Sequence, residues 1–416
     1  MITKLAWKNI WFKPLNTILS VILLTSSVAI ITTLILVEKQ FEEKFTSNIE
    51  DVDLVLGAQG SPLQLILSSV YQVDSPTGNI NYDSAKVWMN NPYVEKAIPL
   101  AFGDNYRGYK ILGTSHDYLA KYKAKLAEGK LFEKNFEVVV GSEIAQKLNL
   151  KIGDEFYGSH GDAEEGEVHE NYAYKVVGIA SKTGKVVDNL ILCTIPTVWQ
   201  MHHGHEEIPA HGEEGHIHEE GDEHQKADLT LDEPNMEITA VLLKIRNQMA
   251  KLTWQRVVPQ NTKMQAASPA FEVNRLFGLF GIGVTALQYL AYGIMLISGI
   301  SIFIALFNTL KERKVEFALM RVNGARRFQL LKVVMIESLL LCVVGFIFGT
   351  ILGRVALSML SNSSEEDFKM SFNPYEFLWQ KEGALFLVTL FVGFIAALIP
   401  AVKAYNLNIS KTLANA

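Results

Sequence analysis

The chain contains 416 residues, 49% of them hydrophobic, with a mean hydropathy of +0.15 and a formal net charge of −6. This hydropathy favours a membrane protein whose apolar residues are concentrated in a few segments. The acidic balance offers no basic surface for nucleic acid, so nucleic-acid binding is excluded. Cys193 and Cys342 are the only cysteines, and no disulfide is expected because the second lies in an apolar run.

Four apolar segments are long enough to cross a bilayer. We predict transmembrane helices at residues 15–37, 284–310, 329–360 and 383–403. The first has no charged residue, and at a rise of about 1.5 Å per residue it exceeds a hydrocarbon core of roughly 30 Å, which favours a retained anchor over a cleaved signal peptide. The uncharged stretch before Lys311 would span roughly 50 Å as one helix, so its glycine-rich start, Gly278 to Gly283, is expected outside the membrane.

The distribution of lysine and arginine predicts the orientation. Residues 1–14 and 404–416 carry lysines without acidic residues, and lysine and arginine outnumber acids in the segment 311–328. Cytoplasmic segments near membrane spans retain such an excess, so these three are predicted to be cytoplasmic. Residues 38–283 and 361–382 are then extracytoplasmic.

Residues 38–283 alternate short β-like runs with turns and short helices. The runs 137–140, 174–177 and 238–243 are predicted strands, and residues 142–150 a short helix with Ser142 as its N-cap. The predicted fold class is therefore an α+β membrane protein. Four transmembrane α-helices carry a large extracytoplasmic α+β domain, inserted between helices 1 and 2.

Glycines recur at a spacing of four in the third predicted helix. Gly345, Gly349 and Gly353 share one face, which permits close approach of another helix. We predict that this face is a helix-packing surface. The alternative is that a short glycine pattern recurs by chance, since glycine is common in membrane helices.

The third predicted helix contains the charged residues Lys332, Glu337 and Arg354. Glu337 is close to its cytoplasmic end, where Arg327 and Lys332 are the expected partners of a satisfied pair. A channel or metal conduit would need ionisable groups inside the helices. Glu337 and Arg354 alone give that function little support.

One glycine-rich stretch has a superficial likeness to a phosphate-binding loop. In Gly178 to Lys185 five residues separate the glycines where four are required, and Val186 stands where serine or threonine is needed. No nucleophile, base and orienting residue can be assembled from spacing either. We therefore predict no nucleotide site, no catalytic residues and no intrinsic cofactor.

The segment from Lys311 to Arg327 mixes charged and apolar residues directly after the second predicted helix. Gly324 is suited to end a short helix there, and Arg326 begins the return to the membrane. By physical chemistry alone this could be a juxtamembrane helix lying on anionic lipid.

The same segment resembles the coupling helix of the MacB/FtsX-like ABC permease family. Members carry a charged and apolar stretch with an Arg-x-x-Gly-Ala pattern between their second and third helices, matched here by Arg321, Gly324 and Ala325. Other parts of the chain are similar to the same family: residues 5–10 to its amphipathic helix before the first span, residues 399–404 to the end of its fourth helix, and residues 143–148, 153–154 and 176–179 to its periplasmic core.

The resemblance implies a permease subunit in a bacterial inner membrane, with ATP hydrolysis on a separate cytoplasmic ABC ATPase. It implies a second permease chain, identical or different, and mechanical work on a periplasmic or lipoprotein partner. Residues to which it assigns ATPase coupling are Glu316, Phe317, Met320, Arg321, Gly324 and Ala325. The alternative function is a membrane-anchored metal sensor or scaffold without ATP coupling.

Histidine and carboxylate residues are concentrated in the segment 202–224. Its histidines are His202, His203, His205, His211, His216, His218 and His224. Neutral imidazole is a good ligand for zinc, copper or nickel, and carboxylates add oxygen ligands. We predict that the segment binds a divalent transition metal, with Zn²⁺ as the expected ion, through several exchangeable modes. The alternative is an acidic loop that binds metal only loosely.

Overall fold

The computed structural model describes residues 6–7, 14–159, 168–203, 229–368 and 372–408. The chain forms two compact units. The first comprises Met1–Glu42 and Gly278–Ala416 and is called the helical unit below. The second comprises Glu43–Phe277 and is called the inserted domain.

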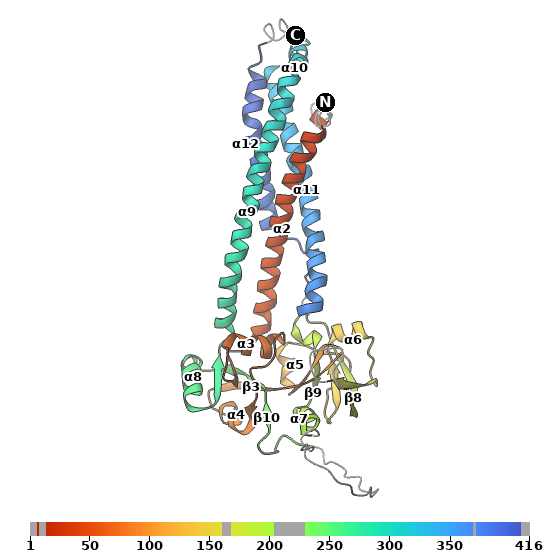
Figure 1. Ribbon diagram of the computed structural model, residues 1–416, viewed down its shortest axis with the longest axis vertical. Helices are drawn as coiled ribbons and strands as arrows, with labels where there is room; N and C mark the ends of the chain where they lie inside the picture. The colour runs from red at the N-terminus through yellow and green to blue at the C-terminus, as the bar shows by residue number, and fades with distance from the viewer. Residues whose placement is uncertain (1–5, 8–13, 160–167, 204–228, 369–371, 409–416) are drawn as a thin grey trace, which may run out of the picture. The chain divides into compact units, whose positions relative to one another are not determined.

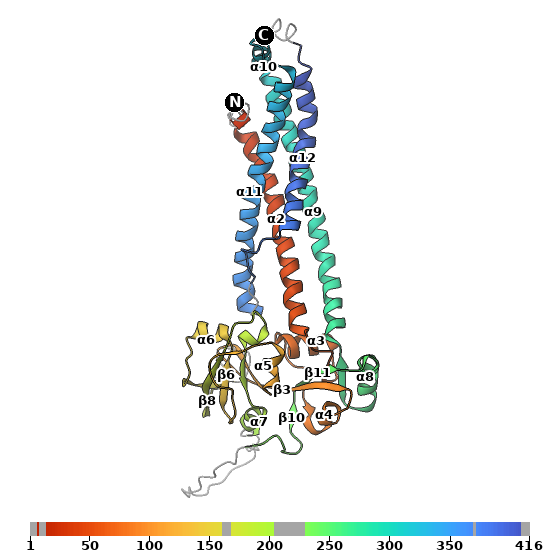
Figure 2. The same ribbon diagram turned by 180° about the vertical axis from the view of Figure 1, so that it is seen from behind.

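Four long helices dominate the helical unit and run side by side (Figures 1 and 2). They are α2 (Pro14–Ile49), α9 (Pro269–Glu312), α11 (Arg327–Phe368) and α12 (Trp379–Tyr405), and the short α10 (Lys314–Val322) connects α9 to α11. The most apolar window of each long helix has a mean hydropathy between 2.3 and 2.7, and only 39–44% of that window is buried within the chain. The remaining apolar surface suits helices that contact lipid.

The helices extend beyond the predicted spans. Helix α9 begins at Pro269 and continues through Gly278 and Gly283, where a Cβ atom would meet no other atom within 4 Å. A glycine costs an exposed helix only about 1 kcal/mol, so these residues do not interrupt it. With 44 residues, α9 is longer than a bilayer core of about 30 Å requires. The predicted membrane boundaries, including the start at residue 284, stay predictions.

The inserted domain is built on a ten-stranded sheet with the order β12-β1-β11-β3-β4-β9-β6-β8-β5, in which β7 pairs with β3 and β8. Its strands are β1 (Leu54–Ala58), β3 (Val94–Tyr106), β4 (Tyr109–Thr114), β5 (Leu126–Gly129), β6 (Glu137–Val140), β7 (Glu155–Ser159), β8 (Val168–Ala180), β9 (Ile191–Cys193), β11 (Ala240–Ile245) and β12 (Met264–Ala267). A separate two-stranded sheet pairs β2 (Ile80–Asn81) with β10 (Glu237–Ile238).

Helices cover both faces of the large sheet. They are α3 (Pro62–Ile66), the π-helix η1 (Leu67–Tyr71), α4 (Tyr82–Met89), α5 (Asp117–Lys121), α6 (Ser142–Leu148), the 3-10 helix η2 (Val186–Asn189), α7 (Ile195–His203) and α8 (Gln248–Asn261). Helices α4 and α7 lie on one face and α3 on the other (Figures 1 and 2). The predicted α+β class, with the domain inserted between the first two long helices, is confirmed.

The core of the inserted domain follows the two-residue period of its strands. Leu54 and Leu56 of β1, and Val138 and Val140 of β6, are fully buried in one cluster. Helices contribute large aromatic side chains to this cluster, and the rings of Trp88 and Trp254, for example, meet edge to face at 5.0 Å. Two strand pairs are parallel, β4 with β9 and β6 with β8, so crossover connections fix part of the sheet.

The predicted local elements agree closely with the structure, with two differences. The predicted strand 238–243 divides at Thr239, whose hydroxyl accepts a hydrogen bond from the Phe102 backbone at 2.8 Å. The prediction of Ser142 as an N-cap is wrong, because Gly141 is the N-cap of α6. The Gly141 backbone N–H donates to the Leu190 carbonyl at 2.9 Å, which holds Gly141 extended as the N-cap, and the helix begins one residue earlier than an N-cap at Ser142 implies.

Candidate functional site

Helix α10 packs through one face onto the helical unit. Phe317 is 3% exposed and belongs to a buried cluster that contains Leu306 and Leu310 of α9 and Val333 of α11. Met320 packs against the edge of the same cluster. The buried face therefore fixes the orientation of α10 on the long helices.

The end of α10 is a Schellman motif. Gly324 has a φ of +93°, a conformation that glycine adopts without steric cost. The N–H of Ala325 donates to the Met320 carbonyl at 3.0 Å, and that of Gly324 to the Arg321 carbonyl at 3.1 Å. Arg321 adds a bond from Nη1 to the Ala325 carbonyl at 2.9 Å. This 6→1 and 5→2 pattern ends the helix and redirects the chain, as predicted for Gly324.

The start of α11 is fixed in a similar way. The Gln329 side chain accepts a hydrogen bond from the Arg326 N–H at 2.8 Å, which is half of a capping box. At the other end of α10, buried Arg313 donates from Nε to the Glu316 carboxylate at 2.7 Å. The turn between the two long helices is thus held by hydrogen bonds at both of its ends.

The six predicted coupling residues fall into two groups. Phe317 and Met320 are packed onto the helical unit, whereas Glu316, Arg321, Gly324 and Ala325 hold the two ends of α10 through their side chains or backbone, and of these Glu316 and Gly324 are also exposed. Sequence reasoning missed Leu319 and Val322, which are 49% and 62% exposed and three residues apart on the outer face of α10. In a sequence, these two look like further core positions of an amphipathic helix. Their exposure makes them the apolar part of the free surface of α10.

The predicted glycine face of α11 lies against α2 of the same chain. A Cβ atom at Gly345 would approach Leu24 to 2.6 Å, and one at Gly349 would lie 2.6 Å from the Cβ of Val28. At Gly353 a Cβ atom would lie 2.8 Å from the Ala29 carbonyl oxygen. Thr33 of α2 donates to the Gly353 carbonyl at 3.0 Å. The absence of side chains on α11 therefore permits the close approach of α2.

The partners predicted for Glu337 are wrong. Its buried carboxylate interacts electrostatically with Arg313, whereas the side chains of Arg327 and Lys332 are exposed. The reversal of the chain at α10 returns Arg313 to α11, a placement that sequence distance does not reveal. Glu337 and Arg313 therefore help to hold α10 on the long helices.

Arg354 also has a partner at a helix end. Its Nη2 lies 2.6 Å from the Glu382 carboxylate, which is 1% exposed and also accepts from the Leu378 N–H. Arg354 donates as well to the Glu376 carbonyl at 3.3 Å. A nearly buried, multiply hydrogen-bonded pair is a structural connection between α11 and α12. It gives no support to a conducting pathway.

Within the inserted domain, the end of α2 is held by four lysines, which we call the α2 clamp: Lys121, Lys123, Lys185 and Lys244. Lys121 Nζ donates to the Asn48 carbonyl at 2.7 Å. Lys123 and Lys185 pair with Glu50 at 3.2 and 3.1 Å, and Lys244 pairs with Asp51 at 2.7 Å.

Further hydrogen bonds hold the same helix end. The Tyr71 hydroxyl donates to the Phe45 carbonyl at 2.8 Å, and the Val186 N–H donates to the Asn48 side chain at 3.0 Å. The last carbonyl groups of a helix lack helical partners and carry the negative end of its dipole. The lysines and these donors therefore complement both the charge and the geometry of the helix end.

Lys121 is the buried member of the clamp, with 7% exposure. The pKa of Lys121 is lowered to about 7, mainly by burial and to a smaller extent by the neighbouring charge of Lys185. The negative charges of Asp51 and Glu50 oppose this shift. The Lys121 ammonium lies 3.6 Å from the ring centroid of Tyr122. The pKa of Glu50 is lowered, chiefly by its hydrogen bond from Lys185.

The predicted metal-binding segment falls mostly outside the described residues. His202 and His203 end α7, while His205, His211, His216, His218 and His224 lie beyond the described part of the chain. Within the described residues, no group of three or more His, Cys, Asp or Glu side chains is arranged to hold a metal. Metal binding stays a prediction from composition.

Four long apolar helices with an α+β domain between the first two define a membrane protein of the permease class. Two family models match the chain, a MacB-like periplasmic core domain over residues 16–214 and an FtsX-like permease C-terminal domain over residues 289–409. Together they cover both units. The chain belongs to the MacB/FtsX-like family of ABC transporter permeases.

Individual relatives match a smaller part. The macrolide export ATP-binding/permease protein MacB of Campylobacter jejuni subsp. jejuni is 29% identical over 114 residues, which cover 27% of this chain and 17% of that protein. The protein of the same name from Agrobacterium fabrum is 28% identical over 120 residues, covering 29% of this chain and 18% of that protein. The match thus spans less than a fifth of the length of these relatives.

Two solved structures are similar to part of the chain. The periplasmic region of MacB from Actinobacillus actinomycetemcomitans is 11% identical, with a TM-score of 0.35, covering 56% of this chain and 97% of that one. The extracellular domain of the noncanonic ABC-type transporter YknZ from Gram-positive bacteria is 11% identical, with a TM-score of 0.31, covering 52% of this chain and 99% of that one.

Proposed function

We propose that the chain couples a separate cytoplasmic ATPase, bound at α10, to movement of the inserted domain on the other side of the membrane. The outer face of α10 is the observation that carries this proposal. It combines exposed Leu319 and Val322 with the exposed carboxylate of Glu316, on a helix whose opposite face and both ends are fixed. A rigid helix with an apolar strip and a polar rim is suited to protein docking.

Packing of α10 supports the transmission of force to the long helices. Phe317 lies in the same buried cluster as Leu24, Val28 and Ile31 of α2. Close-packed side chains cannot be displaced singly, so a movement of α10 would be passed to α2 through this cluster. Helix α2 contributes to this cluster and extends as far as Ile49. The residues held by the α2 clamp lie in its last turn and directly after it.

The clamp is suited to receive such a movement. It joins the last turn of α2 to residues of α5, β11 and the turn before η2, which are distant in sequence. Several charged contacts on one helix end resist its displacement relative to the domain more than a single contact would. A shift of α2 would therefore carry the whole inserted domain with it.

We further propose that the permease works as a dimer in the inner membrane, with both termini cytoplasmic. The excess of lysine and arginine in residues 311–328 supports this orientation. The large apolar surface left on the long helices can accommodate both lipid and a second chain. A periplasmic or lipoprotein partner, and a part in zinc handling through residues 202–224, are further proposals that rest on the family resemblance and on composition respectively.

Replacement of Leu319 and Val322 by glutamate tests the docking surface. Both side chains are exposed, so the double variant should fold normally, yet a charged helix face should abolish co-purification of the ATPase. The matched control is Leu252→Glu, which changes an apolar residue of the inserted domain that is 70% exposed. An ATPase that remains bound to the double variant as it does to the control would refute docking at α10.

A further inference from the structure

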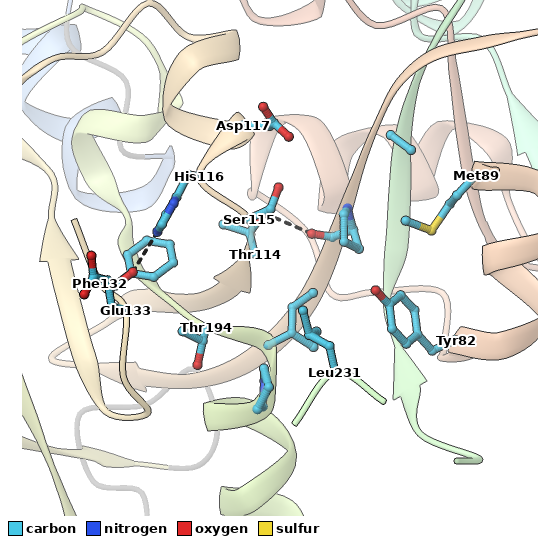
Figure 3. Close-up of a pocket in the computed structure, with 14 residues that line it drawn as sticks. Tyr82, Met89, Thr114, Ser115, His116, Asp117, Phe132, Glu133, Thr194 and Leu231 are labelled. Atoms are coloured by element: carbon cyan, nitrogen blue, oxygen red, sulfur yellow. Dashed lines mark hydrogen bonds between the residues drawn. The ribbon is translucent and has the colours of Figure 1, made fainter. Parts of the chain in front are cut away.

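The inserted domain contains a pocket of about 500 Å³ where two parallel strands end. Strands β4 and β9 pair in parallel, so the residues that follow both strands meet at one edge of the sheet. Thr114 ends β4 and Ser115 to Asp117 follow it, Thr194 to Pro196 follow β9, and both segments line the pocket (Figure 3). A crevice outside the carboxyl ends of parallel strands is a frequent position for ligand binding.

Most of the wall is apolar. Met89, Pro99, Phe132, Ile195 and Leu231 come from separate parts of the domain and line the space. Figure 3 shows Met89, Phe132 and Leu231 around it. The volume lies in the range of pockets that enclose small organic molecules, about 300 to 1,000 Å³. The pocket therefore offers an apolar environment for a compact ligand.

Two hydroxyl groups in this wall have no hydrogen-bond partner among the residues that the structure describes. Tyr82 is 6% exposed, its hydroxyl points into the pocket, and none of the described residues accepts or donates a hydrogen bond to it (Figure 3). The Ser115 hydroxyl is buried and also lacks a partner among the described residues. Buried polar groups are nearly always hydrogen-bonded, so the Ser115 hydroxyl indicates a polar group supplied by a ligand or by water, and the Tyr82 hydroxyl, which faces the pocket, can bind the same kind of group.

The charges around the pocket are predominantly acidic. Asp117 and Glu133 lie at its border, and neither lysine nor arginine is among the described residues that line it. Burial raises the pKa of Tyr82, and the negative charges of Asp232 and Asp83 raise it further. A negative potential near the hydroxyl has this effect because it disfavours the phenolate.

The basic side chains near this wall are already engaged. Lys130, whose charge interacts with Glu133, pairs with Glu137 at 2.9 Å. Lys86 contacts the Tyr82 ring at 4.5 Å, but its ammonium pairs with Asp83 at 3.4 Å and donates to the Leu231 carbonyl at 3.2 Å. His116 lies 2.7 Å from the Phe132 carbonyl through Nε2, so that nitrogen must be the donor. Lys86 and His116 thus bind backbone carbonyls of the pocket wall. The carboxylates of Asp117 and Glu133 stay available to a ligand.

We propose that this pocket binds a small organic cation whose apolar body fills the space and whose ammonium lies at the acidic border, beside Asp117 or Glu133, while the Tyr82 hydroxyl faces the ligand from the opposite side (Figure 3). The apolar walls stabilise the body, and the carboxylates select the charge. An organic cation donates hydrogen bonds from its N–H groups, so the Tyr82 hydroxyl serves as acceptor for the ligand, through water where the donor is distant. The site is independent of ATPase docking at α10, so either proposal can fail alone.

The test uses three indoles that share one ring system and differ in charge: tryptamine (cation), tryptophol (neutral) and indole-3-acetate (anion). Each is titrated calorimetrically into the full chain in detergent, with a protein-free micelle titration subtracted. We expect the affinity order tryptamine, tryptophol, indole-3-acetate. Equal affinity for all three, or tightest binding of indole-3-acetate, would overturn the proposal.

Variants locate the binding. Asp117→Asn with Glu133→Gln should weaken tryptamine binding about tenfold, because hydrogen bonds to charged groups contribute at least 1.5 kcal/mol, and should leave tryptophol binding unchanged. Tyr82→Phe should weaken tryptamine binding to a similar extent. The matched control is Glu128→Gln, an exposed acid of the same domain outside the pocket. Tryptamine binding that is equal in the double variant, Tyr82→Phe and the control would refute this site.

Discussion

Replacement of Lys121 by methionine is expected to change how the stability of the inserted domain depends on pH. Methionine fills a similar volume but cannot carry a proton, and Lys121 is 7% exposed. Burial is the main cause that lowers the pKa of Lys121 from 10.5 to about 7 in the folded domain. In the unfolded chain this lysine has its ordinary pKa.

The sign of the effect follows from these two pKa values. Between pH 7 and 10.5 the unfolded chain binds a proton that the folded domain has released. Stability therefore increases with pH across this window, and below it the folded domain carries the full cost of a buried ammonium. At about 1.4 kcal/mol per pKa unit the total is of the order of 5 kcal/mol, and the expected slope between pH 8 and 9 is about 1 kcal/mol per pH unit.

Urea unfolding of the full chain in detergent, followed by tryptophan fluorescence, provides the assay. Trp88, Trp199 and Trp254 pack in the core of the inserted domain and report on its unfolding. The wild type should gain stability from pH 7.5 to 9, whereas Lys121→Met should be nearly flat. The control is Lys123→Met, whose side chain is 69% exposed, and which should keep the wild-type slope. Equal slopes for Lys121→Met and the wild type would refute the lowered pKa.

Three further predictions test the helical unit and the metal segment. Gly349→Leu should lower the melting temperature sharply, because a Cβ atom there would lie 2.6 Å from the Cβ of Val28, whereas Gly293→Leu, with nothing within 4 Å, should have little effect. Arg354→Met should cost about 3 kcal/mol or more by leaving Glu382 buried without its cation, and Arg354→Met with Glu382→Met should recover part of that loss; equal losses in the single and double variants would contradict an ion pair. Deletion of residues 204–224 should remove zinc binding measured by titration of the full chain at neutral pH, and an unchanged affinity would place the metal elsewhere.

Local sequence patterns were sufficient for elements whose formation depends on neighbouring residues. The strand Glu137–Val140 was predicted to the residue, because three consecutive β-branched valines are followed by a glycine. Gly324 was predicted as a helix end, and its φ of +93° shows why glycine suits that position. The error at Ser142 arose because a long-range bond from Gly141 to Leu190 decides where the strand stops.

The α2 clamp and the pocket depend on contacts that sequence spacing does not reveal. Lys121 and Asn48 are 73 residues apart, and a lysine on a short helix is ordinarily a solvated side chain. The pocket exists because β4 and β9 are parallel neighbours, although most pairs in the sheet are antiparallel. Residues after the two strands share no motif that would connect them. The α2 clamp and the pocket both follow from the topology of the sheet, which could not be predicted from the positions of the strands in the sequence.

The two groups of coupling residues also determine which variants can test ATPase docking. Arg321 donates to the Ala325 carbonyl, and Gly324 has a conformation that other residues adopt only with strain. Loss of ATPase binding after Arg321→Glu or Gly324→Leu would follow equally from a disordered turn and from a damaged interface. The side chains of Leu319 and Val322 take no part in the hydrogen bonds that end α10, to which Leu319 contributes only its backbone carbonyl, and both side chains are exposed. Changes at these two positions therefore report on docking itself, and the Arg321 and Gly324 variants can be interpreted only after them.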